Sequence, residues 1–151
     1  MTTPAEKTLC DAVASEINAS GIDLGIGIVA VSSYRPPSER AAFSDRKITA
    51  VPAARREQIV SRSQQQVDID IDIAVQKEIA KKPDTDRESQ IAAERGLVES
   101  IMNHLAFNSL ADYSDATWIA NANEPIYVPE HLDDRNIFTS VIRTTYRIYT
   151  T

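Results

Sequence analysis

The clearest pattern in the chain is a strict alternation of aliphatic and polar residues between positions 64 and 79. Every second position from Val67 to Val75 is isoleucine or valine. The positions between them hold Asp68, Asp70 and Asp72. Successive side chains of a strand point to opposite faces of a sheet, so a period of two indicates one apolar and one polar face. The pattern predicts a long, half-buried strand over residues 64–79.

Four other segments have the apolar content of strands. They are residues 26–34, 46–52, 116–121 and 136–150. In the last of these, four apolar residues fall on one parity and two arginines fall on the other. The apolar residues are Phe138, Ile142, Tyr146 and Ile148, and the arginines are Arg143 and Arg147. The final strand is therefore also predicted to bury only one face.

Residues 53–63, AARREQIVSRS, separate two predicted strands and are basic. Their arginines are Arg55, Arg56 and Arg62. If the flanking strands pair, this segment is a long hairpin loop. Long loops in small domains tend to carry function. We predict a basic loop over 53–63 that reaches a neighbouring molecule.

Two segments show the apolar spacing of helices. Residues 4–20 follow Thr3, which suits a helix cap, and begin at Pro4, which suits the first helical position. Residues 86–107 carry one broad apolar stripe. The stretch NANEPIYVPEHLDDRN is predicted to be an irregular connection. The element order indicates a single α+β domain over residues 1–151, with a mainly antiparallel sheet of about four to five strands and two main helices packed on one face.

The composition is that of an ordinary globular chain. Of its 151 residues, 42% are hydrophobic and 25% are charged. The net charge of −6 is uneven, because residues 35–62 carry seven Lys or Arg and three acids while both flanking segments are acidic. Opposite patches favour self-association, whereas duplex DNA binding needs a larger basic surface.

The cysteine content and the hydropathy indicate where the chain is made. Cys10 is the single cysteine, which rules out an intrachain disulfide and favours a reducing compartment. The first residues lack the pattern of a signal peptide, and no apolar run reaches the length of a membrane span. We expect a protein made in the cytoplasm that has no membrane partner.

The three aspartates allow two interpretations. Carboxylates two residues apart on a strand lie about 6.6 Å apart, so two of them could share a cation with help from a neighbour such as His131. The continuous aliphatic stripe on the opposite face instead favours a polar outer face. Arg143 and Arg147 are spaced to meet these acids across a strand pair. We favour the second interpretation and predict no metal and no cofactor.

Other candidate chemistry is sparse. His104 and His131 lack the spacing of zinc ligands, and no phosphate-binding or nucleophile motif is present. Tyr113, Trp118 and Tyr127 could stack single-stranded bases. Acidic residues interrupt them, so packing is the preferred interpretation. The chain is therefore predicted to be an interaction or assembly protein and not an enzyme.

Three stretches resemble a known group of proteins. They are TLCDAVASEIN near the N-terminus, DIDIAVQKEI in the middle and NEPIYVPEHLDDRNIFTSVIRTTYRIYT at the C-terminus. Together they resemble the tail-terminator, or tail-completion, proteins of long-tailed bacteriophages. The resemblance covers most of the chain in the order of its elements. Its motifs are patterns and contain no catalytic fingerprint.

The resemblance implies structural work in a virion assembled in the host cytoplasm. Such proteins form a hexameric ring that caps the tail tube, joins it to the neck and, in contractile tails, meets the sheath. The implied partners are further copies of the chain, the tail tube protein and a neck or connector protein. DNA would pass through the lumen without specific binding, past a surface carrying Asp68, Asp70 and Asp72. The candidate subunit and tube contacts are Arg55, Arg56, Arg62, Asp68, Asp70, Asp72, Arg143 and Arg147.

Alternative functions remain open at this stage. One is another neck or connector adaptor protein, and another is a tube-like or sheath-interacting protein. A third, from a different class, is a small metal-dependent hydrolase that uses Asp68, Asp70 and His131. A fourth is a small nucleic-acid-binding module.

Overall fold

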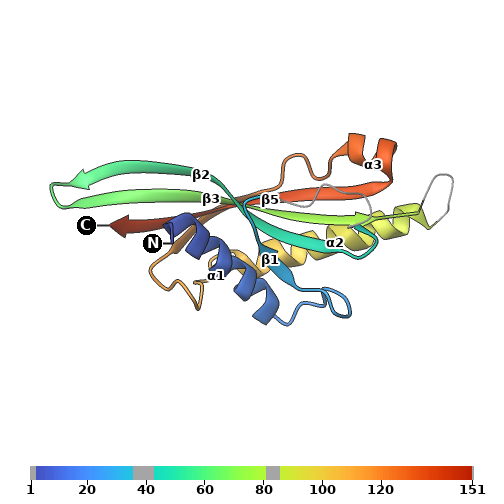
Figure 1. Cartoon of the computed structure of the whole chain (residues 1–151), viewed down its shortest axis with the longest axis horizontal. Coiled ribbons are helices and arrows are strands. Elements are labelled where there is room, and N and C mark those ends of the chain that lie inside the picture. Colours follow the sequence, from blue (N-terminus) through green and yellow to red (C-terminus); the bar gives the residue numbers. More distant parts are fainter. Residues whose placement is uncertain (1–2, 36–42, 81–85, 151) are drawn as a thin grey trace.

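The protein is an α+β structure built on one five-stranded mixed sheet (Figure 1). The computed structural model describes residues 3–35, 43–80 and 86–150. Its elements are α1 (Ala5–Ala19), β1 (Ala30–Ser32), β2 (Lys47–Ser61), β3 (Gln64–Glu78), α2 (Arg87–Leu105), β4 (Thr117–Ala122), α3 (Pro129–Arg135) and β5 (Ile137–Thr150). The strand order is β1-β2-β3-β5-β4, and only the β1–β2 pair is parallel.

The structure confirms the predicted class and the main elements. The strand predicted over 64–79 is β3, and both predicted helices form. The sheet is mixed, however, because β1 runs parallel to β2. Within the predicted strand 26–34, only Ala30–Ser32 is paired. Gly25 and Gly27 have φ values of 111° and 73°, which few other residues adopt, so the chain turns there before the strand begins.

The predicted basic loop over 53–63 is wrong. Strand β2 continues to Ser61, and a tight turn at Arg62 and Ser63 joins it directly to β3. The segment shows no apolar alternation because this end of β2 is exposed on both faces. Its extended backbone is held by pairing with β3 along its length and not by burial of side chains. A hairpin tip therefore projects past α1 and past the end of β5 (Figure 1).

The connection predicted to be irregular contains a third, short helix. Helix α3 begins at Pro129, where the missing N–H costs nothing. It ends at Arg135 and is capped by Asn136, which has a φ of 55°. Asparagine tolerates this left-handed conformation better than most residues. Leu132 is buried, so the helix is anchored to the body of the protein.

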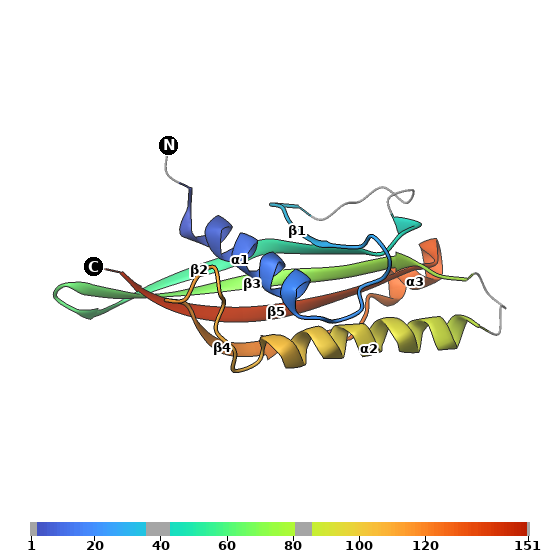
Figure 2. The ribbon, with the colours of Figure 1, turned by 90° about the horizontal axis from the view of Figure 1, so that it is seen from below.

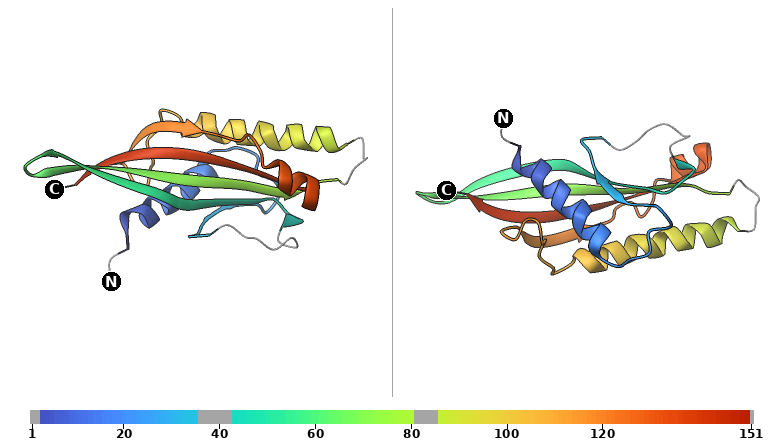
Figure 3. Two further views of the ribbon diagram at one scale, coloured as in Figure 1. Left: turned by 90° about the horizontal axis from the view of Figure 1, so that it is seen from above. Right: turned by 60° about the horizontal axis from the view of Figure 1, so that its bottom comes forward.

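The core lies between the sheet and the two long helices. Helices α1 and α2 lie on the same face, with α1 crossing the strands and α2 running on the β4 side (Figures 2 and 3). The aliphatic stripe of β3 is completely buried beneath them, as the alternation predicts. Burying one such side chain contributes about 1.5–3 kcal/mol. Arg46, just before β2, fixes α2 by donating from Nε to Glu94, at 2.8 Å.

The opposite face of the sheet is only partly covered. Helix α3 lies on this side, away from α1 and α2 (Figure 1). His131 on α3 lies 2.9 Å from the hydroxyl of Thr139 on β5. This contact connects the helix to the first residues of that strand. Toward the hairpin, the polar residues of β2, β3 and β5 lie beyond this cover. This open half of the sheet carries the aspartates.

Burial along the hairpin predicts two very different effects of the same substitution. Ile71 is fully buried at the centre of β3, so Ile71→Ala should lower the free energy of unfolding by about 2–5 kcal/mol. Ile59, near the hairpin tip, is 73% exposed, and Ile59→Ala should change it by less than about 0.5 kcal/mol. Urea unfolding of both variants at one protein concentration measures the difference. Equal losses would contradict the described burial of β3.

Candidate functional site

Strand pairing brings the three aspartates of β3 into line with polar residues of β5. In the antiparallel register, Asp68 faces Arg147, Asp70 faces Thr145 and Asp72 faces Arg143. Asp68 and Asp72 are four residues apart on β3, and Arg143 and Arg147 are four residues apart on β5. Each of these two aspartates therefore lies opposite an arginine. The cross-strand pairing predicted for Arg143 and Arg147 is confirmed.

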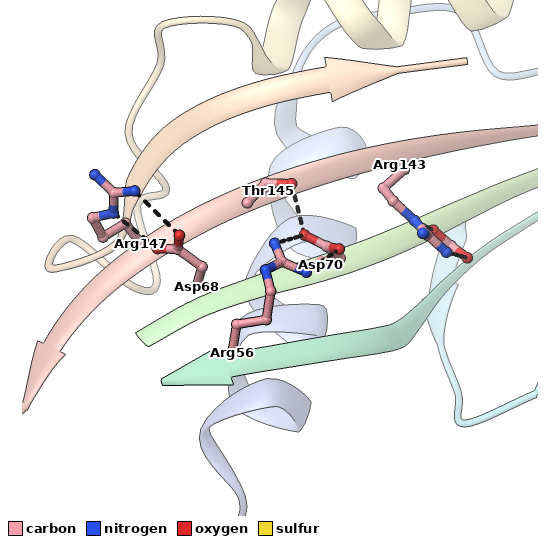
Figure 4. Close-up of polar contacts among 7 residues, drawn as sticks. Arg56, Asp68, Asp70, Arg143, Thr145 and Arg147 are labelled. Carbon is pink, nitrogen blue, oxygen red and sulfur yellow. Dashed lines mark hydrogen bonds and ion pairs between the residues drawn. The ribbon is translucent and has the colours of Figure 1, made fainter. Parts of the chain in front are cut away.

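Both outer pairs are bidentate (Figure 4). Arg147 donates from Nε and Nη2 to the two oxygens of Asp68, at 2.8 and 3.1 Å. Arg143 donates in the same way to Asp72, at 2.9 and 3.1 Å. A planar guanidinium that meets both carboxylate oxygens fixes the orientation as well as the charge. Each of these pairs is therefore held in a defined orientation by two hydrogen bonds.

Asp70, between them, is bound from both neighbouring strands (Figure 4). Arg56 on β2 donates from Nη1 and Nη2 to its two oxygens, at 2.8 and 2.9 Å. Thr145 on β5 donates its hydroxyl to the same carboxylate at 2.7 Å. The Asp70 side chain is only 7% exposed, whereas that of Arg56 is 57% exposed. Asp70 is thus the best-satisfied and most buried of the three acids.

We call the six charged residues of these pairs, together with Thr145, the ion-pair ladder. The hydrogen bonds from Arg56 lower the pKa of Asp70 below its ordinary value of 3.8, and those from Arg147 lower the pKa of Asp68. Both acids are therefore charged at neutral pH, and each is matched by a guanidinium. The ladder is therefore charge-balanced, with three arginines for three aspartates, whereas the resemblance implied an acidic surface.

The arginines of the predicted basic loop separate in the structure. Arg56 joins the ion-pair ladder. Arg55 registers with Ile69 on the helix-covered face, and there it contacts Glu6 of α1 at 3.0 Å. Arg62 lies exposed in the hairpin turn. Six of the eight residues predicted as contacts therefore form one structural unit, and Arg55 and Arg62 lie outside it.

Sequence reasoning missed the partners of Asp70. A signal was present in the chain, because Arg56 and Asp70 lie nearly equally far from the turn at residues 62 and 63. Placing that turn correctly would have put the two side chains on neighbouring strands within one residue of the same level. Thr145 could not be recognised in this way, since its role depends on the register of β5.

The geometry bears directly on the metal-binding alternative. A guanidinium bonds to both oxygens of each of the three carboxylates, and His131 is bonded to Thr139 on a different part of β5. Asp68, Asp70 and His131 are therefore not brought together. In the ranges 3–35, 43–80 and 86–150, no group of three or more His, Cys, Asp or Glu residues is placed to hold a metal ion.

The remaining candidate residues have structural contacts. His104 on α2 lies 3.0 Å from Glu16 on α1 and joins the two helices. Cys10 is fully buried, and that burial raises its pKa to about 12. Trp118 packs on Phe107, with ring centroids 4.7 Å apart, while Tyr127 packs on Phe138 at 6.2 Å. The predicted aromatic residues thus do not form a common stacking surface.

Two comparisons with known proteins were negative. No family model matches the chain, and the search of the curated proteins gives no match either. None of the helices described by the structure is both long enough and apolar enough to cross a membrane. The functional argument therefore depends on the geometry of the sheet and on the sequence resemblance.

The lowered pKa of Asp70 predicts a pH-dependent contribution to stability. Because its folded pKa lies below the unfolded value of 3.8, the contribution is present above that pH and is lost as the pH falls through the folded value. Asp70→Asn should lower the free energy of unfolding by about 1 kcal/mol at neutral pH. The difference from the wild type should shrink in acid, as urea unfolding at several pH values would show.

The control for this variant is Asp112→Asn, which removes one charge at an exposed loop position. It should leave the stability within about 0.5 kcal/mol at each pH. A loss for Asp70→Asn that stays constant from neutral pH into acid would show that the carboxylate charge does not contribute.

Proposed function

We propose that this chain is a structural protein of a tailed bacteriophage, a tail terminator that closes into a ring on the tail tube and joins it to the neck. The element order supports the proposal in part: an N-terminal helix, a hairpin with a long second strand, a helix and a final long strand are present, but the hairpin has a tight turn where the resemblance implies a long loop. The observation that carries the proposal is the charge-balanced ion-pair ladder, which lies on the open half of the sheet.

A charge-balanced face suits a channel through which DNA passes. Sequence-independent DNA affinity comes from Lys and Arg that release counterions from phosphates. In the ladder, each guanidinium already has a carboxylate partner, so it gains little from a phosphate. A face with three bidentate pairs would line a lumen without holding the DNA. The acids provide this effect by neutralising the arginines and not by repelling phosphate.

The structure also suits assembly from many copies. The hairpin tip projects from the body and exposes Ile59 and Val60, at 73% and 45%. Exposed apolar side chains on a projecting segment favour a contact with another protein. The tail tube and the neck protein are the partners that a terminator would meet at the two ends of its ring.

The first test is the mass of the full chain in solution, measured by light scattering after size exclusion over a concentration series. We expect a hexamer, or a monomer that becomes a hexamer as the concentration rises. Electron microscopy of the same fractions should show closed rings with a central hole. A chain that stays monomeric at every concentration and forms no ring with tail tubes would refute the proposal.

A second test concerns the ladder alone. The triple variant Asp68→Asn, Asp70→Asn, Asp72→Asn removes the three negative charges that neutralise the guanidinium groups and keeps side chains of the same shape. It should gain binding to linear duplex DNA that weakens steeply with salt, by up to about one logarithmic unit of slope per guanidinium group. The wild-type chain should show little binding in the same fluorescence anisotropy titration.

The matched control moves the same charge change to other exposed sites. The variant Asp112→Asn, Asp115→Asn, Glu99→Gln alters the net charge equally but leaves the ladder intact. If both triple variants gain the same DNA affinity, overall charge explains the effect and the ladder has no special role.

A further inference from the structure

The two edges of the sheet have open backbone at matching levels. Strand β1 pairs with β2 only at Ile48–Ala50. Within the part of the chain that the structure describes, no strand pairs with the outer edge of β2 beyond that point. Residues paired across successive strands form one cross-strand row. Ala122 at the end of β4 lies in the same row as Val51 of β2, and Thr117 at the start of β4 lies in the same row as Arg56. The open stretch of β2 therefore begins at the level where β4 ends.

The strand directions also suit a continuation of the sheet. Strand β4 is antiparallel to β5, β5 to β3 and β3 to β2. It follows that β4 and β2 of one chain run antiparallel. A second copy added beside the first in the same orientation would place its β2 antiparallel to the first copy's β4. Antiparallel addition to a free edge is an established way for sheets to join.

The β4 edge carries an exposed aromatic residue in a strained conformation. Phe107, just after α2, is 89% exposed and has a φ of 62°. Residues other than glycine enter this region at a cost of about 1–2 kcal/mol. Its ring packs on Trp118 of β4, yet most of its surface is left to solvent. The strained backbone of Phe107 is thus not compensated by burial of its side chain. Strained and exposed residues of this kind are found where a protein contacts another molecule.

The β2 edge carries a hollow at the corresponding level. The hollow is lined by Glu6, Tyr34, Pro52, Ala53, Ala54 and Arg55. Trp118 and Arg55 occupy the two ends of one cross-strand row, which runs through Tyr146 and Ile69 on the helix-covered face. The aromatic pair and the hollow thus lie at the same height and on the same side of the sheet.

The charges of the two edges are complementary. Residues 51–62, which form the open stretch of β2 and its turn, carry three arginines and one glutamate. Residues 108–124, which contain β4, carry three acids and neither lysine nor arginine. Arg55 and Arg56 are already paired with acids of their own chain, so the attraction between the two different edges is modest and comes mainly from Arg62. Two acidic β4 edges repel each other, which disfavours the pairing of like edges. A second copy of this chain therefore supplies a partner of suitable chemistry for each edge.

We infer that copies of this chain join edge to edge, with β4 of one copy adding to Val51–Arg56 of the next and Phe107 entering the hollow. The inference rests on the proposed function, for which it names the contact that closes the ring. The two surfaces differ, so the contact is head-to-tail and generates a ring when the rotation closes. Pro52 lacks an N–H, and both edges contain a bulge, which limits the added ladder of hydrogen bonds. The aromatic contact consequently carries much of the affinity.

Cross-linking tests the register directly. Ala54 and Ala120 belong to one row but lie three strand spacings apart within a chain, about 14 Å. That distance is too long for a disulfide. The double variant Ala54→Cys, Ala120→Cys should therefore form covalent multimers between copies on mild oxidation. The buried Cys10 should not react, and the oxidised wild-type chain verifies this.

The matched control moves one cysteine along the same edge. Ser61 lies five residues beyond Arg56, about 17 Å along the strand. The variant Ser61→Cys, Ala120→Cys should give no multimers under the same oxidation. Equal cross-linking of both double variants would show random collision and would overturn the inference.

Phe107 tests the anchor. Phe107→Gly keeps the left-handed backbone without strain but removes the ring, and it should weaken self-association by about tenfold or more in the light-scattering series. Ile26→Ala removes a fully exposed side chain elsewhere and should leave association unchanged. Thermal unfolding of the Phe107 variant confirms that the fold is retained.

The outcomes separate the inference from the proposed function. If the wild type forms closed rings but the Ala54–Ala120 cysteine pair does not cross-link and Phe107→Gly associates normally, the inference fails and the tail-terminator proposal stands. If the cysteine pair gives multimers that never close into rings, the inference stands and the proposed function fails. A wild type that stays monomeric at all concentrations overturns the inference.

Discussion

The structure depends on the pairing of β3 along its full length with a strand on each side. Lys47–Ser61 of β2 and Ile137–Thr150 of β5 both run antiparallel to it. This central position satisfies the backbone of β3 on both edges and fixes the level of every residue on its neighbours. The helices then need only to cover the aliphatic face that this pairing presents. The positions of the charged residues on the other face follow from the same register.

The ion-pair ladder shows how the charges of a polar sheet face are paired without a second covering layer. A carboxylate on a central strand is shielded by its neighbours, and an unpaired charge there would be costly. Each aspartate is instead matched by an arginine from an adjacent strand, and Asp70 is held from both sides. The result is a face with defined shape and little net charge. Such a face offers a polyanion few positive charges that are not already paired.

The edges of the sheet follow a different physical rule. The backbone of an edge strand must meet solvent, a covering segment or another chain. Here the short β1 covers only the first part of the outer edge of β2, and β4 leaves its outer edge uncovered by any strand among the described residues. The described fold is thus closed along its helix-covered face and open at its sides. It is at these open sides that we infer the contact between copies.

The sequence by itself determined the elements whose signal is local. The period-two alternation of β3 and β5 and the apolar stripes of the helices predicted the fold class, the buried face and the opposition of Arg143 and Arg147 to aspartates. The sequence alone could not predict that β2 extends to Ser61, because an exposed strand is held by backbone pairing and shows no apolar pattern. Only the tertiary structure decided that Arg56 binds Asp70 and that the levels of β2 and β4 match, since register is set by strands distant in sequence.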